Sequence, residues 1–169
     1  MLCLADGEGR NSVFLASLGY TVTAVDLSVE GLRKAEQLAR ERGVSVEFVH
    51  ADLAEYDFPQ ALSGIVSIFA HVPRALRQRL HEQSAAALAA GGVFLLEAYR
   101  PEQLAFGTGG PRDVALLPSL AELEHELHPL HLVTARAVER DVQEGIFHGG
   151  PSATVQVIAV KLTESGRKE

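Results

Sequence analysis

The chain has 169 residues, of which 47% are hydrophobic and 22% are charged, a composition typical of one globular domain. Its 15 Lys and Arg against 22 Asp and Glu give a formal charge of −7, which disfavours a nucleic-acid partner. Cys3 is the single cysteine, and no apolar run approaches the roughly 20 residues that span a bilayer. We therefore expect a cytoplasmic protein that does not partner a membrane.

Short apolar runs alternate with amphipathic segments over the first hundred residues. The pattern predicts strands at 1–5, 21–25, 44–49, 64–70 and 93–99, and helices at 10–18, 29–42 and 74–90. Ser28 is expected to cap the second helix, and Gly91-Gly92 to end the third. Helices between most of these strands indicate a parallel sheet with helices on both faces.

The pattern changes after Tyr99. Residues 100–118 are rich in Gly and Pro, which is typical of a functional loop or lid. Ser119 and Glu122 predict a capping box for a helix that ends near residue 127. Two alternating runs, 131–142 and 153–162, follow with no helix between them, so they should pair antiparallel. We expect one domain over residues 1–162 and a frayed tail over 163–169.

Acidic residues and glycines follow three of the predicted strands. Asp6-Gly7-Glu8-Gly9 follows the first strand, Asp26 ends the second, and Asp52 follows the third. Ligands of open parallel sheets bind beyond the carboxyl ends of the strands. Glycines allow close approach to the backbone, Asp26 can accept ribose hydroxyls, and Asp52 can accept an adenine amino group. Together they predict a pocket for an adenosine that is joined to a carboxylate.

Each feature also has a purely structural interpretation. The Gly-x-Gly sequence can simply form a tight turn, Asp26 can precede the Ser28 cap, and Asp52 can cap a turn. A dinucleotide fingerprint needs a third glycine where Ser12 stands, so a nicotinamide-dependent oxidoreductase is disfavoured. S-adenosylmethionine is the other ligand class that fits, because its methionine part needs less space and no pyrophosphate-binding amides.

Residues 2–16 (LCLADGEGRNSVFLA) and 19–28 (GYTVTAVDLS) resemble class I S-adenosylmethionine-dependent methyltransferases, most closely the tellurite-resistance-type small-molecule branch. The resemblance continues to about Tyr99. It implies an α/β, Rossmann-like three-layer sandwich with a mostly parallel seven-stranded sheet of order 3-2-1-4-5-7-6, ending in an antiparallel hairpin. It also implies S-adenosyl-L-methionine as cofactor and methyl transfer to a small-molecule acceptor by in-line displacement.

The resemblance assigns roles to residues at matching positions. The glycines would pass along the methionine part of the cofactor, the strand-end aspartates would hold ribose and adenine, and Leu53 would lie beside the ring. Phe69 and His71 would face the methyl-transfer cavity. The expected cofactor-binding residues are Asp6, Gly7, Gly9, Asp26, Leu27, Asp52, Leu53 and Phe69.

His71 is the predicted general base, because imidazole titrates near neutral pH. Its structural alternative is a helix-entry residue before Pro73. The expected substrate-side residues are Glu97, Tyr99, Phe106, Phe147 and His148. No metal is expected, although three histidines recur at 125, 128 and 131. The cations Arg74, Arg77 and Arg79, with His81, are expected to form a solvated helix face.

Three departures from the family pattern stand out. Cys3 occupies the position of an acidic residue, and Ala5 that of a glycine. The chain also begins inside the first strand, where family members carry an N-terminal segment. We expect a start site assigned too late; a genuinely short chain would expose apolar surface and favour a homodimer. It would also favour the alternative of a cofactor-binding but catalytically idle module.

Overall fold

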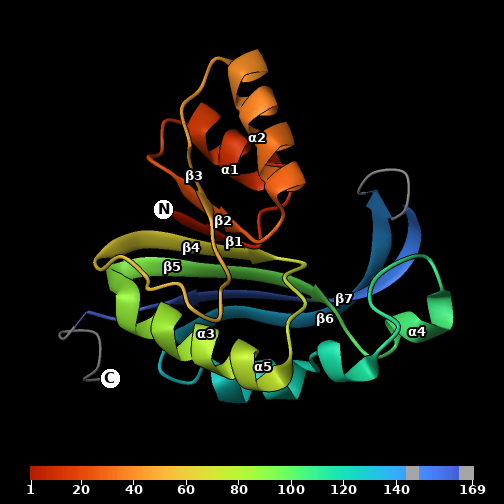
Figure 1. The fold of residues 1–169 in the computed structure, drawn as a ribbon. Helices are drawn as coiled ribbons and strands as arrows, with labels where there is room; N and C mark the ends of the chain where they lie inside the picture. The colour runs from red at the N-terminus through yellow and green to blue at the C-terminus, as the bar shows by residue number, and fades with distance from the viewer. Residues whose placement is uncertain (144–148, 164–169) are drawn as a thin grey trace.

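The computed structural model describes residues 1–143 and 149–163 and is built on a seven-stranded sheet of order β3-β2-β1-β4-β5-β7-β6 (Figure 1). Strands β1 to β5 pair in parallel, whereas β7 runs antiparallel to both β5 and β6. The predicted fold class and strand order are therefore confirmed. The strands are β1 (Leu2–Leu4), β2 (Thr23–Asp26), β3 (Glu47–His50), β4 (Leu62–Ile68), β5 (Leu88–Tyr99), β6 (His131–Gln143) and β7 (Gly149–Val160).

Helices lie on both faces of the sheet, as Figure 1 shows. Helices α1 and α2 cover one face near β1 to β3, and α3 and α5 cover the opposite face. On the α1 and α2 side, Leu95 of β5 and Ile158 of β7 each remain 37% exposed. The helices are α1 (Arg10–Ser17), α2 (Val29–Arg42), α3 (Arg74–Ala87), α4 (Gln103–Phe106) and α5 (Leu120–Glu126), with a 3-10 turn at Val114–Leu116.

Strand β1 lies at the centre of the core. Leu2 and Leu4 belong to the larger apolar cluster on the α3 and α5 side, whereas Cys3 belongs to the cluster beside α1. Successive side chains of a strand point to opposite faces, so all three β1 residues are buried. This explains why the strand appears in the sequence as an uninterrupted apolar run.

Local signals at the helix ends form as predicted. Ser28 Oγ accepts a hydrogen bond of 3.0 Å from Gly31 N at the start of α2. Gly43 ends the same helix with φ 65°, in the left-handed region. The capping box of Ser119 and Glu122 is complete at the start of α5.

The predicted boundary at Gly91-Gly92 is wrong, because α3 ends at Ala87 and β5 already begins at Leu88. The alanine-rich run favours a helix, but Leu88 is buried and pairs with Leu62 of β4. The register then shifts between Leu62 and Gly64. A Cβ on Gly92 would lie 2.8 Å from the Leu62 carbonyl oxygen, so strand pairing here requires a glycine.

Two other sequence expectations differ from the structure at their edges. Strand β7 begins at Gly149 rather than at residue 153, and it ends at Val160. The glycine- and proline-rich loop contains α4 and the 3-10 turn. Of the predicted tail, all but Thr163 lies outside the described residues.

Ala5 adopts φ 48° immediately after β1, where the family pattern has glycine. This left-handed conformation costs an L-residue roughly 1–2 kcal/mol. Ala5→Gly relieves it but loses a partly buried methyl group and adds unfolded-chain entropy of about 0.5–1 kcal/mol. We therefore expect urea unfolding of Ala5→Gly to give a free energy within about 0.5 kcal/mol of the wild type, or higher.

Ala24→Gly is the matched control, because Ala24 is a buried β2 residue outside the left-handed region. It should destabilise the protein by about 1–2 kcal/mol through lost burial and added entropy. Equal destabilisation by the two substitutions would show that Ala5 carries no strain.

Candidate functional site

Asp6 turns its carboxylate inward from the loop after β1. Its oxygens accept hydrogen bonds from Ser12 Oγ at 2.5 Å and from Ser12 N at 3.2 Å. Burial raises the pKa of Asp6, and the two Ser12 hydrogen bonds oppose part of that rise. Asp6 therefore fixes the loop to the first turn of α1. Its partner is Ser12, the residue that stands where a dinucleotide-binding fingerprint would have its third glycine.

Asp26 links the loops that follow β1 and β2. Its Oδ2 accepts from Gly7 N at 2.8 Å, and its Oδ1 accepts from Ser28 N at 2.7 Å. A carboxylate oxygen can accept two hydrogen bonds, so each oxygen of Asp26 retains acceptor capacity. The residue is half-buried at the carboxyl end of β2. It can therefore hold this turn together and still bind two hydroxyl groups.

The two glycines of the loop have different surroundings. A Cβ on Gly9 would lie 2.6 Å from Ala35 Cβ, so Gly9 allows the start of α1 to pack on α2. A Cβ on Gly7 would meet nothing within 4 Å, although Gly7 has φ 63°. Gly7 is thus the glycine with open space at its Cβ position, while its N–H is bonded to Asp26 and its carbonyl lies close to Gly31.

The structure separates the two leucines expected to bind the cofactor, of which Leu53 was expected beside the adenine. Leu53 is 7% exposed and belongs to the main core, and its carbonyl accepts a hydrogen bond from Arg79. Leu27 is 64% exposed beside Asp26. Asp52 is also exposed, and its Oδ1 accepts from Ala54 N at 2.8 Å, as in a turn cap. Leu27 therefore offers the exposed apolar side chain at this edge.

Three aromatic rings group at the carboxyl ends of β4 and β5. The Phe69 and Tyr99 centroids lie 4.5 Å apart, and His71 stacks on Tyr99 at 5.5 Å. Phe69 adopts φ 53°, a strained backbone that often accompanies functional sites. His71 Nε2 accepts a 3.1 Å hydrogen bond from Tyr99 N. A base role through Nε2 would require that bond to break, and the general-base role remains a prediction.

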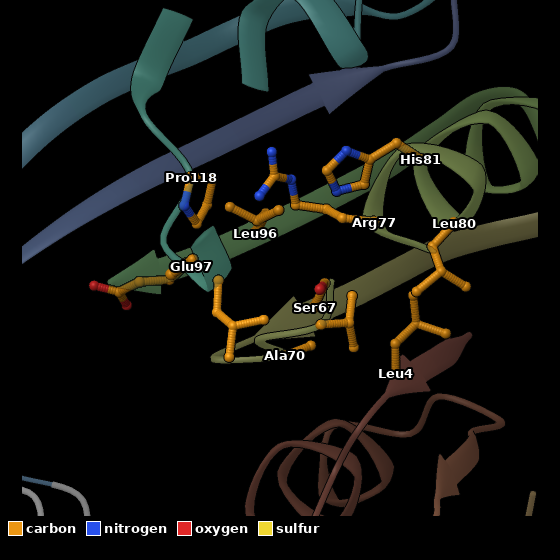
Figure 2. Close-up of a pocket in the computed structure, with 12 residues that line it drawn as sticks. Leu4, Ser67, Ala70, Arg77, Leu80, His81, Leu96, Glu97 and Pro118 are labelled. Atoms are coloured by element: carbon orange, nitrogen blue, oxygen red, sulfur yellow. The ribbon is translucent and has the colours of Figure 1, made fainter. Parts of the chain in front are cut away.

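The other expected substrate-side residues are not brought together. Glu97 points away from the cavity drawn in Figure 2, and its carboxylate binds Arg140 through two 2.8 Å hydrogen bonds. Burial raises the pKa of Glu97, but hydrogen bonds from Arg140 and Gln156 outweigh it and leave the pKa lowered. Phe106 ends α4 and is half-buried. Phe147 and His148 lie outside the described residues.

The predicted lid is anchored to the sheet by Gln103 of α4. Its side-chain amide donates to Thr108 Oγ1 and to the Gly109 carbonyl, and its Oε1 accepts from Ala153 N at 2.7 Å. Gln103 is buried beneath the loop. These bonds fix the first half of the loop against β7.

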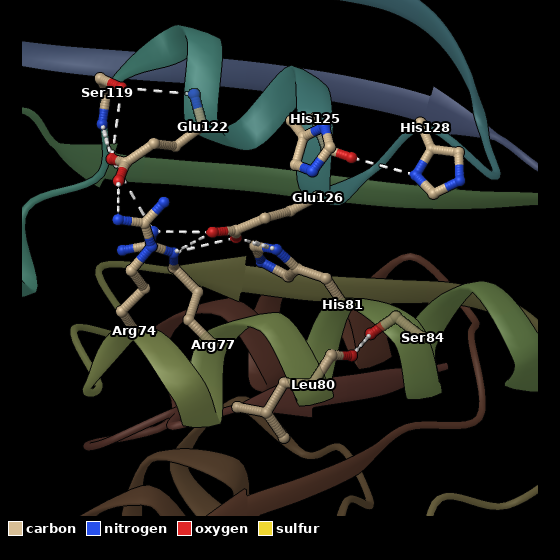
Figure 3. Close-up of polar contacts among 10 residues, drawn as sticks. All are labelled: Arg74, Arg77, Leu80, His81, Ser84, Ser119, Glu122, His125, Glu126 and His128. Carbon is tan, nitrogen blue, oxygen red and sulfur yellow. Dashed lines mark hydrogen bonds and ion pairs between the residues drawn. The ribbon is translucent and has the colours of Figure 1, made fainter.

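A buried ionic cluster joins α3 to α5, and sequence analysis missed it (Figure 3). Arg77 Nη2 lies 2.8 Å from Glu126 Oε1, and His81 Nδ1 lies 2.8 Å from Glu126 Oε2. The three side chains are between 3% and 6% exposed. The expected solvated face is therefore wrong for Arg77 and His81. Their spacing of four residues indicates one helix face, but only the fold brings Glu126 to it.

A cavity lies next to this cluster, at the carboxyl ends of β1, β4 and β5 (Figure 2). Its interior volume is about 20 Å³, which is room for about one water molecule. Most of its lining is aliphatic, and Ser67, Arg77 and His81 contribute polar side chains. The full lining is Leu4, Ser67, Ala70, Val72, Arg77, Leu80, His81, Leu96, Glu97, Ala98, Leu116 and Pro118.

Across residues 1–143 and 149–163, no group of three or more His, Cys, Asp or Glu residues is arranged to hold a metal ion. Within the same ranges, no helix combines the length and apolar character needed to cross a membrane.

Glu126 should make the stability depend on pH. Burial raises its pKa, but hydrogen bonds from His81 and Arg77 outweigh burial and lower the pKa from 4.5 to about 2. The stabilisation is therefore complete above pH 4.5 and is lost as the pH falls towards 2. We expect Glu126→Gln to destabilise the protein by about 3–5 kcal/mol at pH 7, because it removes the carboxylate that makes the short contacts to buried Arg77 and leaves only Glu122, at 3.8 Å.

Urea unfolding between pH 7 and pH 3 measures this effect. Between pH 7 and pH 3, Glu126→Gln should show a shallower acid loss than the wild type by about 2 kcal/mol. Glu124→Gln, on the exposed side of α5, should follow the wild-type curve within about 0.5 kcal/mol. Parallel acid curves for all three proteins would contradict the role of Glu126.

Comparisons with known proteins agree with this geometry. No curated protein matches the chain. A methyltransferase from Methanosarcina mazei, described as SAM-dependent, aligns with a TM-score of 0.77 at 23% identity, over 96% of this chain and 92% of that chain. TehB from Haemophilus influenzae aligns with a TM-score of 0.78 at 17% identity, over 95% of this chain and 57% of TehB.

A third similar structure, the [4+2]-cyclase SpnF, aligns with a TM-score of 0.75 at 16% identity, over 96% of this chain and 75% of SpnF. These identities establish a shared fold alone. The family described as a methyltransferase domain, however, matches residues 1–92, which is more than half of the chain. The chain therefore belongs to the methyltransferase domain family.

Proposed function

We propose that this protein binds S-adenosyl-L-methionine and transfers its methyl group to a small-molecule acceptor. The observation that carries the proposal is the pair of loops joined by Asp26, with open space beside Gly7 at the carboxyl ends of β1 and β2. This is the edge at which open parallel sheets bind nucleosides. Membership of the methyltransferase domain family supports the same reaction class.

The residues present fit the proposed cofactor. Asp26 retains acceptor capacity on both oxygens for the ribose hydroxyls, and the open space beside Gly7 leaves room for the methionine part. Leu27 offers an exposed apolar surface for the adenine, and Asp52 retains an oxygen with no partner among the described residues. Bound S-adenosylmethionine supplies an activated methyl group on sulfur.

The chain's own residues would mainly bind and orient the two reactants. Orientation alone can lower a barrier by about 7–11 kcal/mol, so in-line methyl transfer needs no strong acid or base when the acceptor is a good nucleophile. Phe69, His71 and Tyr99 form the wall of the site at β4 and β5. Their rings would orient the acceptor by packing against it. This role is compatible with the hydrogen bond from Tyr99 N that His71 Nε2 already accepts.

Two features favour a small molecule as acceptor. The net charge of −7 opposes nucleic-acid binding, and the cavity at the strand ends is small. The narrower assignment to a tellurite-resistance-type branch rests on the Gly-x-Gly-Arg-Asn sequence and its neighbours. Cytoplasmic location is proposed from the single buried thiol, because a buried Cys3 without a partner suits a reducing compartment.

A cofactor-binding but catalytically idle protein is the second candidate. It is favoured by His71, whose Nε2 is engaged by a backbone amide. One protein of similar fold is called a [4+2]-cyclase, so this fold is not restricted to methyltransferases by name. Cofactor binding and turnover therefore need separate measurements.

Isothermal titration with S-adenosylhomocysteine tests the cofactor site. Asp26→Ala should weaken binding at least tenfold, because it removes the ribose acceptors and frees the Gly7 loop. Glu30→Ala is the control, since Glu30 is an exposed carboxylate of α2 that pairs with Arg33. It should bind like the wild type, and NADH should give no heat. Equal affinity for Asp26→Ala and the wild type would exclude this site.

His71→Ala tests the residue at the acceptor side. We expect turnover, measured as S-adenosylhomocysteine release with an acceptor found by panel screening, to fall at least tenfold. Cofactor affinity should fall less than threefold. If both quantities fell by the same factor, His71 would be a structural residue of the aromatic group. A complete panel without product would favour the idle protein.

A further inference from the structure

Helix α4 lies beside β7 (Figure 1) and holds the loop that follows it through one buried amide. Gln103 is 1% exposed, and its Nε2 donates to Thr108 Oγ1 at 3.0 Å and to the Gly109 carbonyl at 3.1 Å. Its Oε1 accepts from Ala153 N at 2.7 Å, next to the last residue pair of β5 and β7. A buried amide with these bonds made has one orientation, so Gln103 fixes the loop relative to β7.

Thr108 attaches the same loop to β7 a second time. Its Oγ1 accepts from Gln103 Nε2 and donates to the Pro151 carbonyl at 2.7 Å. Its Cγ2 lies 3.2 Å from the position that a Cβ on Gly150 would take, so the loop also packs closely on the start of this strand. The loop is therefore held against β7 at two neighbouring points.

The loop brings Gly110 against the ring of Tyr99. A Cβ on Gly110 would lie 2.6 Å from Tyr99 Cδ2 and 3.1 Å from Cε2, and the first distance is shorter than real Cβ contacts. Gly110 also has φ 83°, in the left-handed region that favours glycine. Tyr99 is 3% exposed, so its ring cannot move aside without disturbing the side chains packed around it. This close approach therefore requires a glycine.

Tyr99 in turn holds the imidazole of His71 through two contacts. The backbone N of Tyr99 donates to His71 Nε2 at 3.1 Å, and the two rings stack with their planes 10° apart. Because a backbone N–H can only donate, the neutral imidazole carries its proton on Nδ1. Phe69 packs against the same tyrosine ring, with the centroids 4.5 Å apart. The orientation and the tautomer of His71 therefore depend on the position of Tyr99.

We propose that Gln103 and Gly110 are positioning residues for His71, and that they act through Tyr99. Gln103 holds the loop, and Gly110 allows the loop to lie against the tyrosine ring. That ring then keeps His71 in one orientation and one tautomer. The inference rests on the proposed methyl transfer, in which the aromatic rings orient the acceptor. It adds that the loop after β5 determines how precisely they do so.

Nuclear magnetic resonance of the His71 ring nitrogens tests the positioning in the full chain without ligand. At pH 8 the imidazole is neutral, and the wild type should show one tautomer, with the proton on Nδ1. Gly110→Ala should show a mixture of both tautomers, because the added methyl group forces the loop and the Tyr99 ring apart. A mixture in the wild type would overturn the proposal, and a single tautomer in Gly110→Ala would overturn the role of Gly110.

Gly107→Ala is the matched control in the same loop. Gly107 has φ 64°, also in the left-handed region, but a Cβ there would meet nothing within 4 Å. The substitution therefore adds backbone strain of the same kind as Gly110→Ala without a contact to Tyr99. It should keep the single His71 tautomer. A mixture equal to that of Gly110→Ala would show that strain in the loop is sufficient, and would contradict the proposal.

Gln103→Glu loosens the loop without a steric clash. A carboxylate still accepts from Ala153 N but cannot donate to Thr108 or to the Gly109 carbonyl. The contact with β7 should therefore remain while the loop moves away from Tyr99, and a mixture of His71 tautomers is expected even if Gly110→Ala folds poorly. A single tautomer in Gln103→Glu would overturn the role of Gln103.

Kinetics separate this inference from the proposed methyl transfer. With an acceptor found by panel screening, kcat should fall at least fivefold in Gly110→Ala and Gln103→Glu. The affinity for S-adenosylhomocysteine should stay within twofold of the wild type. Mixed tautomers with an unchanged kcat would overturn the positioning role. Absence of turnover in the wild type, with the single His71 tautomer present, would instead refute the proposed methyl transfer and leave the contacts that hold His71 established.

Discussion

The Asp26 carboxylate is the contact on which the candidate site depends. The loops after β1 and β2 are adjacent because these strands pair in parallel. Both loops bind this side chain, since Gly7 N and Ser28 N each donate a hydrogen bond to it. Parallel pairing brings the strand ends to one edge, and the carboxylate then fixes the loops relative to each other. The same group retains acceptor capacity towards solvent. Structure and proposed ribose binding therefore share one side chain without competing for it.

A second constraint acts from beneath the sheet. The Arg77, His81 and Glu126 cluster joins α3, which follows the β4 end, to α5, which follows the long loop. Gln103 fixes the other end of that loop to β7. Removing one member of a buried pair costs about 3–5 kcal/mol, so the cluster strongly favours one arrangement of these elements. The wall of the cavity is thus set by ionic contacts outside the proposed reaction centre.

Sequence reasoning succeeded where the signal was local or strictly periodic. The run at β1, the Ser28 cap and the capping box at Ser119 follow from short-range chemistry. It failed where a residue distant in the sequence determines the local structure. Leu88 belongs to β5 because it pairs with Leu62 of β4, and His81 is buried because it packs against Glu126. Strand-end residues could be placed at one edge, but their side-chain directions could not, which is why Leu53 proves to be a core residue.

Cys3 stands where the family pattern has an acidic residue, and the nearby carboxylates of Asp6 and Glu8 do not take its place. Burial, with the nearby charge of Asp6, raises the pKa of Cys3 to about 12, so it remains a neutral thiol. Asp6 directs its own carboxylate to Ser12, and Glu8 pairs with Lys34 at 2.7 Å. Both carboxylates are therefore engaged elsewhere, and neither substitutes for the acidic residue that the family pattern has at position 3. In the proposed complex, Asp26 has to supply most of the polar recognition, which makes cofactor affinity unusually dependent on the geometry of a single turn.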